Sequence, residues 1–260
     1  MGRMKAAGPL GALPTTKEHI RAMDITSTEE RRNTLFRIGA VCAIAGTIGY
    51  LALFLLHGDL PDETPQSALS WVADRPFSLL HMGIILCSLL WVGALIALAE
   101  SLVGATSWAL GRLGSAAAVV GATLLAVHYR IDGPALEQVA DAWAAADGAR
   151  RDELLEQGEL VLLMTGGGFP LYVALLLGLP FLLFGLAVIF SNNYPSWLGW
   201  LGAVAGAGAF VVGTANFAGF EFPPIELFVI FVFLLDIWML VIGTLMWRST
   251  RRADVASRRG

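Results

Sequence analysis

A single carboxylate interrupts a long apolar stretch of this 260-residue chain. The stretch runs from Phe228 to Gly243 and carries Asp236 in its middle as the one charged residue. An isolated carboxylate is costly to ionise among apolar groups, so we expect Asp236 to keep its proton. A neutral carboxyl there could carry a proton or contact a bound solute. It could instead tie two helices together through a hydrogen bond.

Two histidines form the second candidate site. His81 lies 24 residues before a turn expected near residue 105, and His128 lies 23 residues after it. Since the two flanking helices would run antiparallel, both imidazoles are expected at about the same depth. Paired imidazoles at one level could ligate a haem iron or another metal ion, with Arg75 or Arg130 near haem propionates. The alternative is two ordinary histidines satisfied by water or backbone.

Three further polar residues are expected near the level of these histidines. Thr214, Asn216 and Glu226 fall at the same end of the last two apolar runs. With His81 and His128 they could form one outward-facing polar pocket above Asp236. Such a pocket would suit a small-molecule ligand.

The sequence "MTGGGFP", from Met164 to Pro170, contains three glycines and a proline that disfavour a regular helix. We expect a flexible joint at this point. The alternative is a broken helix whose free backbone groups line a cavity, as in transporters.

Composition identifies the elements that must position these residues. The chain is 56% hydrophobic and 15% charged, with a mean hydropathy of +0.68, whereas soluble domains carry about 25% charged residues. The apolar residues fall in blocks of about 20, the length that crosses a bilayer as a helix. We therefore predict an all-α bundle of six membrane-spanning helices. The expected spans are 35–56, 76–99, 112–130, 169–190, 196–218 and 224–247.

Basic residues predict the orientation of these spans. Thirteen of the 17 Lys and Arg residues fall on the side of the two termini, and four fall on the other side. Because basic residues are retained on the cytoplasmic side, both termini are predicted to be cytoplasmic. Residues 1–33 would be a polar cytoplasmic segment, 34–248 the membrane domain and 249–260 a basic tail. Arg outnumbers Lys by 15 to 2, which is typical of a GC-rich bacterial genome and favours a bacterial cytoplasmic membrane.

Capping signals predict two further features. Ser27 and Glu30 have capping-box spacing, which predicts a helix start just before the first span. In the outer segment 132–165, Asp132 could cap a helix that has Pro134 in its first turn and ends near Gly148. We expect two short amphipathic helices there, lying over the outer mouth or in the membrane interface.

The odd-numbered spans begin alike, with "RIGAVCAIAG", "RLGSAAAVVG" and "WLGAVAGAGA". The even-numbered spans carry Gly93, Gly185 and Gly243 in register. This pattern predicts three copies of a two-span hairpin, although small residues also recur by chance in membrane helices. Gly202 and Gly206 form a small-xxx-small pair, which favours close helix packing or oligomerisation.

These starts, the segment "DGPALEQVADAWAAA" and the ending "DIWMLVIGTLMWR" resemble a group of actinobacterial six-span membrane proteins of unknown function. The resemblance covers most of the chain from about Arg37 onward. It implies the six-span fold and transfers no catalytic residue.

Three functions are consistent with these residues. The first is binding or transport of a small solute, with Asp236 as the proton-bearing group. The second is a membrane redox or metal protein that uses His81 and His128. The third is an accessory subunit without chemistry. The sequence leaves open whether the chain is an enzyme, although the chain has no nucleophile elbow and no phosphate loop, which favours a role without catalysis. We also expect no nucleic-acid binding, because basic and aromatic residues are not interleaved.

Overall fold

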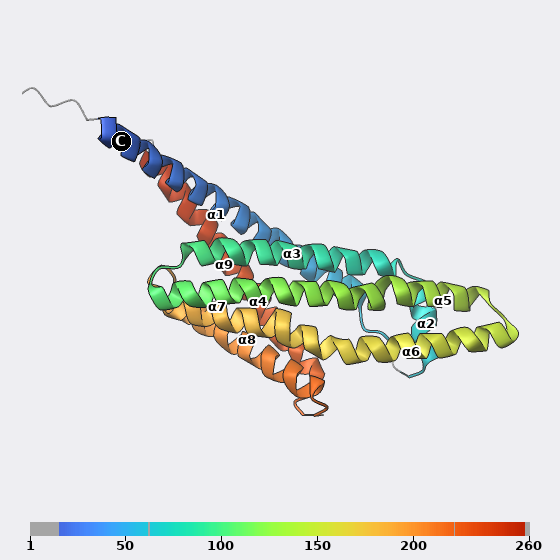
Figure 1. The fold of residues 1–260 in the computed structure, drawn as a ribbon. Helices are drawn as coiled ribbons and strands as arrows, with labels where there is room; N and C mark the ends of the chain where they lie inside the picture. Colours follow the sequence, from blue (N-terminus) through green and yellow to red (C-terminus); the bar gives the residue numbers. More distant parts are fainter. Residues whose placement is uncertain (1–15, 62, 221, 258–260) are drawn as a thin grey trace, which may run out of the picture.

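The computed structural model describes residues 16–61, 63–220 and 222–257, and throughout that part of the chain it contains helices and no strand (Figure 1). Six helical stretches are long and apolar enough to cross a membrane. The prediction of an all-α bundle with six spans is therefore confirmed. The six stretches are Glu29–His57, Phe77–Ser101, Ala105–Ala145, Gly148–Ile189, Ser196–Phe217 and Ile225–Arg251.

The membrane helices form a closed ring in chain order. Helix α1 packs against α3, α3 against α4, α4 against α7, α7 against α8, α8 against α9, and α9 closes on α1. The first turns of α1 and the last turns of α9 consequently lie together at one end (Figure 1). The bounds of these helices are Thr16–His57 for α1, Phe77–Ser101 for α3, Ala105–Arg130 for α4, Leu179–Ile189 for α7, Ser196–Phe217 for α8 and Phe228–Ser257 for α9.

Two of the spans continue well beyond the membrane thickness. The stretch from Ala105 to Ala145 has 41 residues and comprises α4, the π-helical segment η1 (Ile131–Ala135) and α5 (Leu136–Ala145). The stretch from Gly148 to Ile189 has 42 residues and comprises α6 (Gly148–Tyr172), the π-helical segment η2 (Val173–Gly178) and α7. At 1.5 Å per residue each is about 60 Å long, twice the roughly 30 Å of bilayer hydrocarbon. Their far ends form a helical hairpin that projects from the bundle (Figure 1).

The projecting hairpin has its own small core. The short helix α2 (Pro65–Ala73), which the sequence analysis missed, crosses α5 and α6. Thr64 caps α2 by accepting a hydrogen bond from the Ser67 amide, and the Ser67 hydroxyl accepts one from the Thr64 amide. The buried residues of this core are Leu69, Val72, Phe77, Leu136, Ala140, Trp143 and Leu154. The predicted helix break near Gly148 is confirmed, since α5 ends at Ala145 and α6 begins at Gly148. The prediction of two separate short helices over the mouth is wrong, because both helices continue long membrane helices and project from the bundle with them.

Two local predictions of helix ends are also wrong. Residues Ser27 to Glu30 lie inside α1, which is already helical at Thr16. The glycines of "MTGGGFP" lie inside α6, so this segment is neither a joint nor a break. A glycine in a helix costs about 1 kcal/mol relative to alanine, and the packing of α6 against α4, α5 and α8 outweighs that cost.

Aromatic side chains fill the centre of the ring in the half nearer the chain termini. Phe181 of α7 contacts Trp91 of α3 and Trp238 of α9, with ring centroids 5.9 and 5.7 Å apart. Both indole N–H groups are satisfied, since Trp91 donates to the Thr47 hydroxyl and Trp238 donates to the Leu198 carbonyl. Large rings with paired N–H groups make this half a packed core.

The glycines of the expected repeat have different surroundings. A Cβ atom on Gly185 would overlap the backbone of Ala203 in α8, whereas Gly243 faces Ala43 in α1. Gly202 faces Trp238, and Gly206 faces the backbone of α7. The small-xxx-small pair is thus used for packing within the chain.

Candidate functional site

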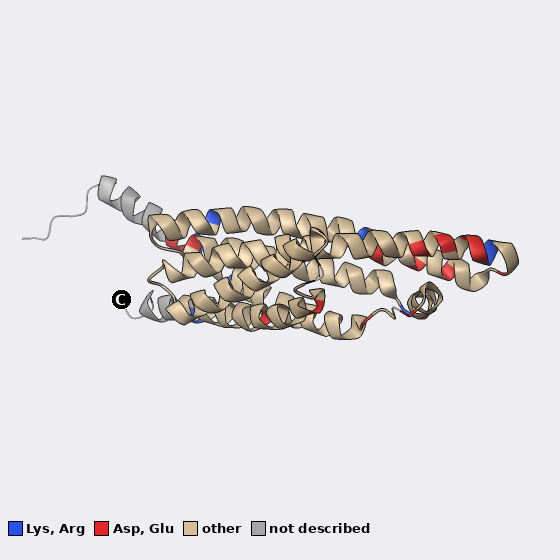
Figure 2. Cartoon of the chain, turned by 90° about the horizontal axis from the view of Figure 1, so that it is seen from below, with Lys and Arg blue, Asp and Glu red and all other residues tan. Residues whose placement is uncertain are grey.

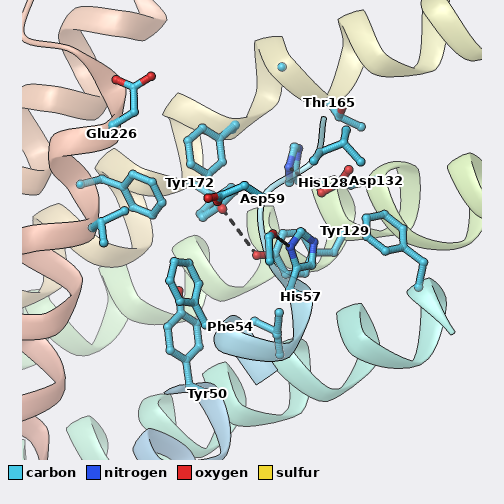
Figure 3. Close-up of a pocket in the computed structure, with 18 residues that line it drawn as sticks. Tyr50, Phe54, His57, Asp59, His128, Tyr129, Asp132, Thr165, Tyr172 and Glu226 are labelled. Carbon is cyan, nitrogen blue, oxygen red and sulfur yellow. Dashed lines mark hydrogen bonds and ion pairs between the residues drawn. The ribbon is translucent and has the colours of Figure 1, made fainter. Parts of the chain in front are cut away.

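The half of the ring away from the chain termini encloses a cavity of about 460 Å³ (Figure 3). Aromatic rings form much of its wall, among them Tyr50, Phe54, Tyr129, Phe169, Tyr172 and Phe228. Its polar wall groups are His57, Asp59, His128, Asp132, Thr165 and Glu226. No Lys or Arg is among the described residues that line it. The cavity is therefore aromatic, rich in hydrogen-bond acceptors and without a fixed cation.

Asp132 is the centre of the polar side of this cavity. Its Oδ2 atom lies 3.0 Å from Nε2 of His81 and 3.9 Å from Nε2 of His128. His81 is 1% exposed, and the Asp132 side chain is 18% exposed where it faces the cavity. The structure thus brings the two predicted histidines together, with a carboxylate oxygen between them. The sequence predicted that Asp132 caps a helix. This prediction is wrong, because the helix continues through Asp132.

The π-helical segment η1 explains how Asp132 reaches this position. Pro134 has no amide hydrogen, and its ring would clash with the carbonyl of Arg130 in a regular α-helix. The wider π-helical turn relieves that clash, and such turns are frequent at functional sites. Gly133 lets the same segment approach α3, because a Cβ atom there would lie 3.0 Å from Cβ of His81.

The hydrogen bonds of His81 define its proton requirement. Nδ1 lies 2.9 Å from the carbonyl oxygen of Phe77, which can only accept, so Nδ1 carries a hydrogen. The Nε2 contact with Asp132 then needs one more proton, on either partner, or a metal ion in its place. With a proton, the His81–Asp132 pair has no net charge in either arrangement.

His57 joins the cluster from the C-terminal end of α1. Its ring is 4.9 Å from the His81 ring, and its Nδ1 is 2.7 Å from the Gly58 carbonyl oxygen. Ring nitrogens of His57 and His81 and a carboxylate oxygen of Asp132 all lie within 4.8 Å of one another. These three side chains could therefore hold a metal ion.

His128 approaches from α4 and packs among tyrosines. Its ring is 5.1 Å from Tyr172 and 5.6 Å from Tyr129, and the two tyrosine hydroxyls are 3.5 Å apart. Gly168 of α6 makes room for it, because a Cβ atom there would lie 2.7 Å from Nδ1 of His128. One glycine of "MTGGGFP" therefore has a role in shaping the site.

The other predicted pocket residues divide into two groups. Glu226 lines the cavity on the α9 side and is exposed (Figure 3). Thr214 is exposed and does not line the cavity. Asn216 donates hydrogen bonds to the carbonyls of Val212 and Pro223, so it holds the loop before α9.

Asp236 lies below the cavity and is not part of its wall. It is 3% exposed, and in the described part of the chain its two carboxyl oxygens have no hydrogen-bond partner. The suggested partners bond elsewhere: Thr47 accepts from Trp91, Ser88 donates to the Ile85 carbonyl and Thr123 donates to the Val119 carbonyl. Val229, which lines the cavity, precedes Asp236 by seven residues, or about 10 Å along the helix.

Sequence reasoning missed two central members of the site, His57 and Asp132. A signal for Asp132 was present, because His128 and Asp132 are four residues apart and share a helix face. His57 ends the first span and His81 lies in the first turns of the second, so the sequence places both at the same end of the bundle.

Comparison of the chain with protein-family models, curated proteins and solved structures found no match in any of the three.

Proposed function

We propose that this polytopic membrane protein binds a small organic solute that is not anionic and that carries hydrogen-bond donors, such as an amine. The observation that supports this most is the composition of the cavity wall. Asp59, Asp132 and Glu226 supply carboxylate oxygens, and the described lining contains no Lys or Arg that could pair with an anion.

The aromatic part of the wall favours the same ligand class. The faces of Tyr50, Tyr172 and Phe228 can attract a cation held within about 6 Å of the ring. They also bury the apolar body of a solute, and a volume of about 460 Å³ is typical of small-molecule pockets. A charged amine would therefore find carboxylates and ring faces together.

The orientation that we propose places this cavity on the outer side of a bacterial cytoplasmic membrane, with both termini in the cytoplasm. Arg31, Arg32, Arg248 and Arg251 lie at the end of the bundle that holds the termini. Acidic residues gather on the projecting α5–α6 hairpin at the opposite end (Figure 2). The positive-inside rule then assigns the terminal end to the cytoplasm.

The test uses two probes of similar shape and opposite charge, benzylamine and benzoate. Benzylamine should raise the thermal unfolding midpoint of the purified protein with increasing concentration, since a ligand that binds only the folded state stabilises it. Benzoate should not. Tyr172→Leu should remove the response, and Phe217→Leu, at an exposed position of α8, should keep it. Equal stabilisation by benzoate, or none by benzylamine, would contradict the proposal.

Proton-linked transport is a second candidate, and one observation favours it. Asp236 is buried in the membrane-spanning part of α9, and its two oxygens are without a partner among the described residues. A protonated carboxyl is the form that costs least there, so Asp236 suits a proton carrier. Because Trp91, Phe181 and Trp238 fill the inner half, passage of a solute would require these helices to move apart.

A further inference from the structure

We propose that His57, His81 and Asp132 form a binding site for a divalent transition-metal ion such as Zn²⁺, with an open coordination position facing the cavity. This goes beyond solute binding and does not depend on it.

The convergence of three donor groups is the first observation. One ring nitrogen from each histidine and one oxygen from Asp132 lie within 4.8 Å of one another. A proton shared between His81 and Asp132 would account for that pair alone. It would not account for the second imidazole, that of His57 in α1, beside the same carboxylate.

The distances suit a metal ion of ordinary bond length. Zinc binds imidazole nitrogen and carboxylate oxygen at about 2.0–2.2 Å, so tetrahedral ligands lie roughly 3.4 Å apart. His81 Nε2 is 3.0 Å from Asp132 Oδ2, and a ring nitrogen of His57 lies within 4.8 Å of both donor groups. The His81–Asp132 contact is close to the required separation, and a movement of the His57 ring toward this pair would complete the site.

The second observation is the orientation of both rings. Nδ1 of His81 faces the Phe77 carbonyl, and Nδ1 of His57 faces the Gly58 carbonyl. Each Nδ1 must therefore carry the hydrogen, which leaves Nε2 with the lone pair that a metal ion requires. Histidines that bind metals almost always donate their other N–H to a carbonyl or carboxylate in this way.

The ligand set and the charge favour a transition metal. Two imidazoles and one carboxylate are the donors of many catalytic zinc and non-haem iron sites, which keep a position open. The cavity supplies that position, since His57 and Asp132 both line it. Asp59 and Glu226 add negative charge to the same wall, which favours entry of a divalent cation.

The test measures metal content, not activity. Purified full-length protein is stripped with a chelator, equilibrated with Zn²⁺ or Co²⁺, desalted and analysed for bound metal. The wild type should retain one Zn²⁺ per chain, and the Co²⁺ form should show visible d–d absorption.

Matched variants separate ligands from neighbours. His57→Gln and Asp132→Asn should weaken Zn²⁺ binding at least tenfold and abolish the Co²⁺ absorption. Asp141→Asn, which changes an exposed carboxylate of α5 that does not line the cavity, should keep both. His57→Gln is the safest probe of a ligand, because its side-chain hydrogen bond is to the adjacent residue.

Two results would overturn the proposal. One is less than one Zn²⁺ per chain in monodisperse wild-type protein at neutral pH. The other is unchanged Zn²⁺ content in monodisperse His57→Gln. Neither result depends on benzylamine binding, so failure of the metal site and failure of the proposed solute site are distinguishable.

Discussion

The contact between His81 and Asp132 predicts a strong stability difference between two substitutions of the same aspartate. Asp132→Ala leaves His81, which is 1% exposed, without a partner for Nε2. Breaking one side of a buried charged pair costs about 3–5 kcal/mol, and we expect the lower end because the Asp132 side chain is 18% exposed. The expected loss is therefore about 3 kcal/mol of unfolding free energy.

Asp132→Asn should cost much less. The amide oxygen can accept from a protonated Nε2, or the amide nitrogen can donate to a neutral one, so a hydrogen bond remains. We expect a loss of about 1 kcal/mol, the ordinary worth of one hydrogen bond. Glu226→Ala, which removes an exposed carboxylate from the same cavity wall, should stay within about 0.5 kcal/mol of wild type.

A double variant tests whether the cost comes from the pair. His81 packs edge-on against Phe77 and Tyr129, with ring centroids 4.4 and 4.6 Å away, so a phenyl ring fits its surroundings. His81→Phe with Asp132→Ala leaves neither partner unpaired. Its loss should be smaller than the sum of the single losses by about 2 kcal/mol or more.

The assay is unfolding of purified, chelator-treated protein by SDS in mixed micelles, followed by the far-ultraviolet circular dichroism of the helices. Equal losses for Asp132→Ala and Asp132→Asn would refute the assigned hydrogen bond. Strict additivity in the double variant would show that the two side chains do not interact.

Two further predictions concern orientation and the buried acid. A cysteine at the exposed Ala145, in a background without Cys42 and Cys87, should react with a membrane-impermeant thiol reagent added outside intact cells; labelling only after the inner face is opened would reverse the orientation. For Asp236, the infrared difference spectrum of wild type against Asp236→Asn at neutral pH should contain a protonated-carboxyl band, because ionisation would bury an unpaired charge. A carboxylate band in its place would mean that a cation compensates Asp236.

The number of spans followed from the sequence alone. Each apolar run matches the thickness of a bilayer, and the backbone must satisfy its own hydrogen bonds there, which only a helix achieves in a single run. The predicted start of the fifth span coincides with the start of α8, immediately after Pro195. The predicted end of the second span is two residues before the observed end of α3. Composition and length are sufficient to predict the number of spans and their approximate ends, because these features depend on the lipid that surrounds the chain.

Local signals were less reliable where packing decided the outcome. Three glycines before Pro170 predicted an interruption, yet α6 is helical there because it packs between other helices. The projecting hairpin and α2 were also missed as a unit. Their small core depends on contacts between residues such as Leu69 and Leu154, which are far apart in the chain.

The candidate site was likewise only partly predictable from the sequence. Equal depth of His81 and His128 followed from the antiparallel order of their helices, and the structure places both beside Asp132. Depth alone does not specify the direction in which a side chain points. The π-helical turn at Asp132 and the close approach at Gly133 determine that direction, and the packing of α1 adds His57. Such geometry arises from several weak contacts between distant segments, so only the tertiary structure could bring these four side chains together.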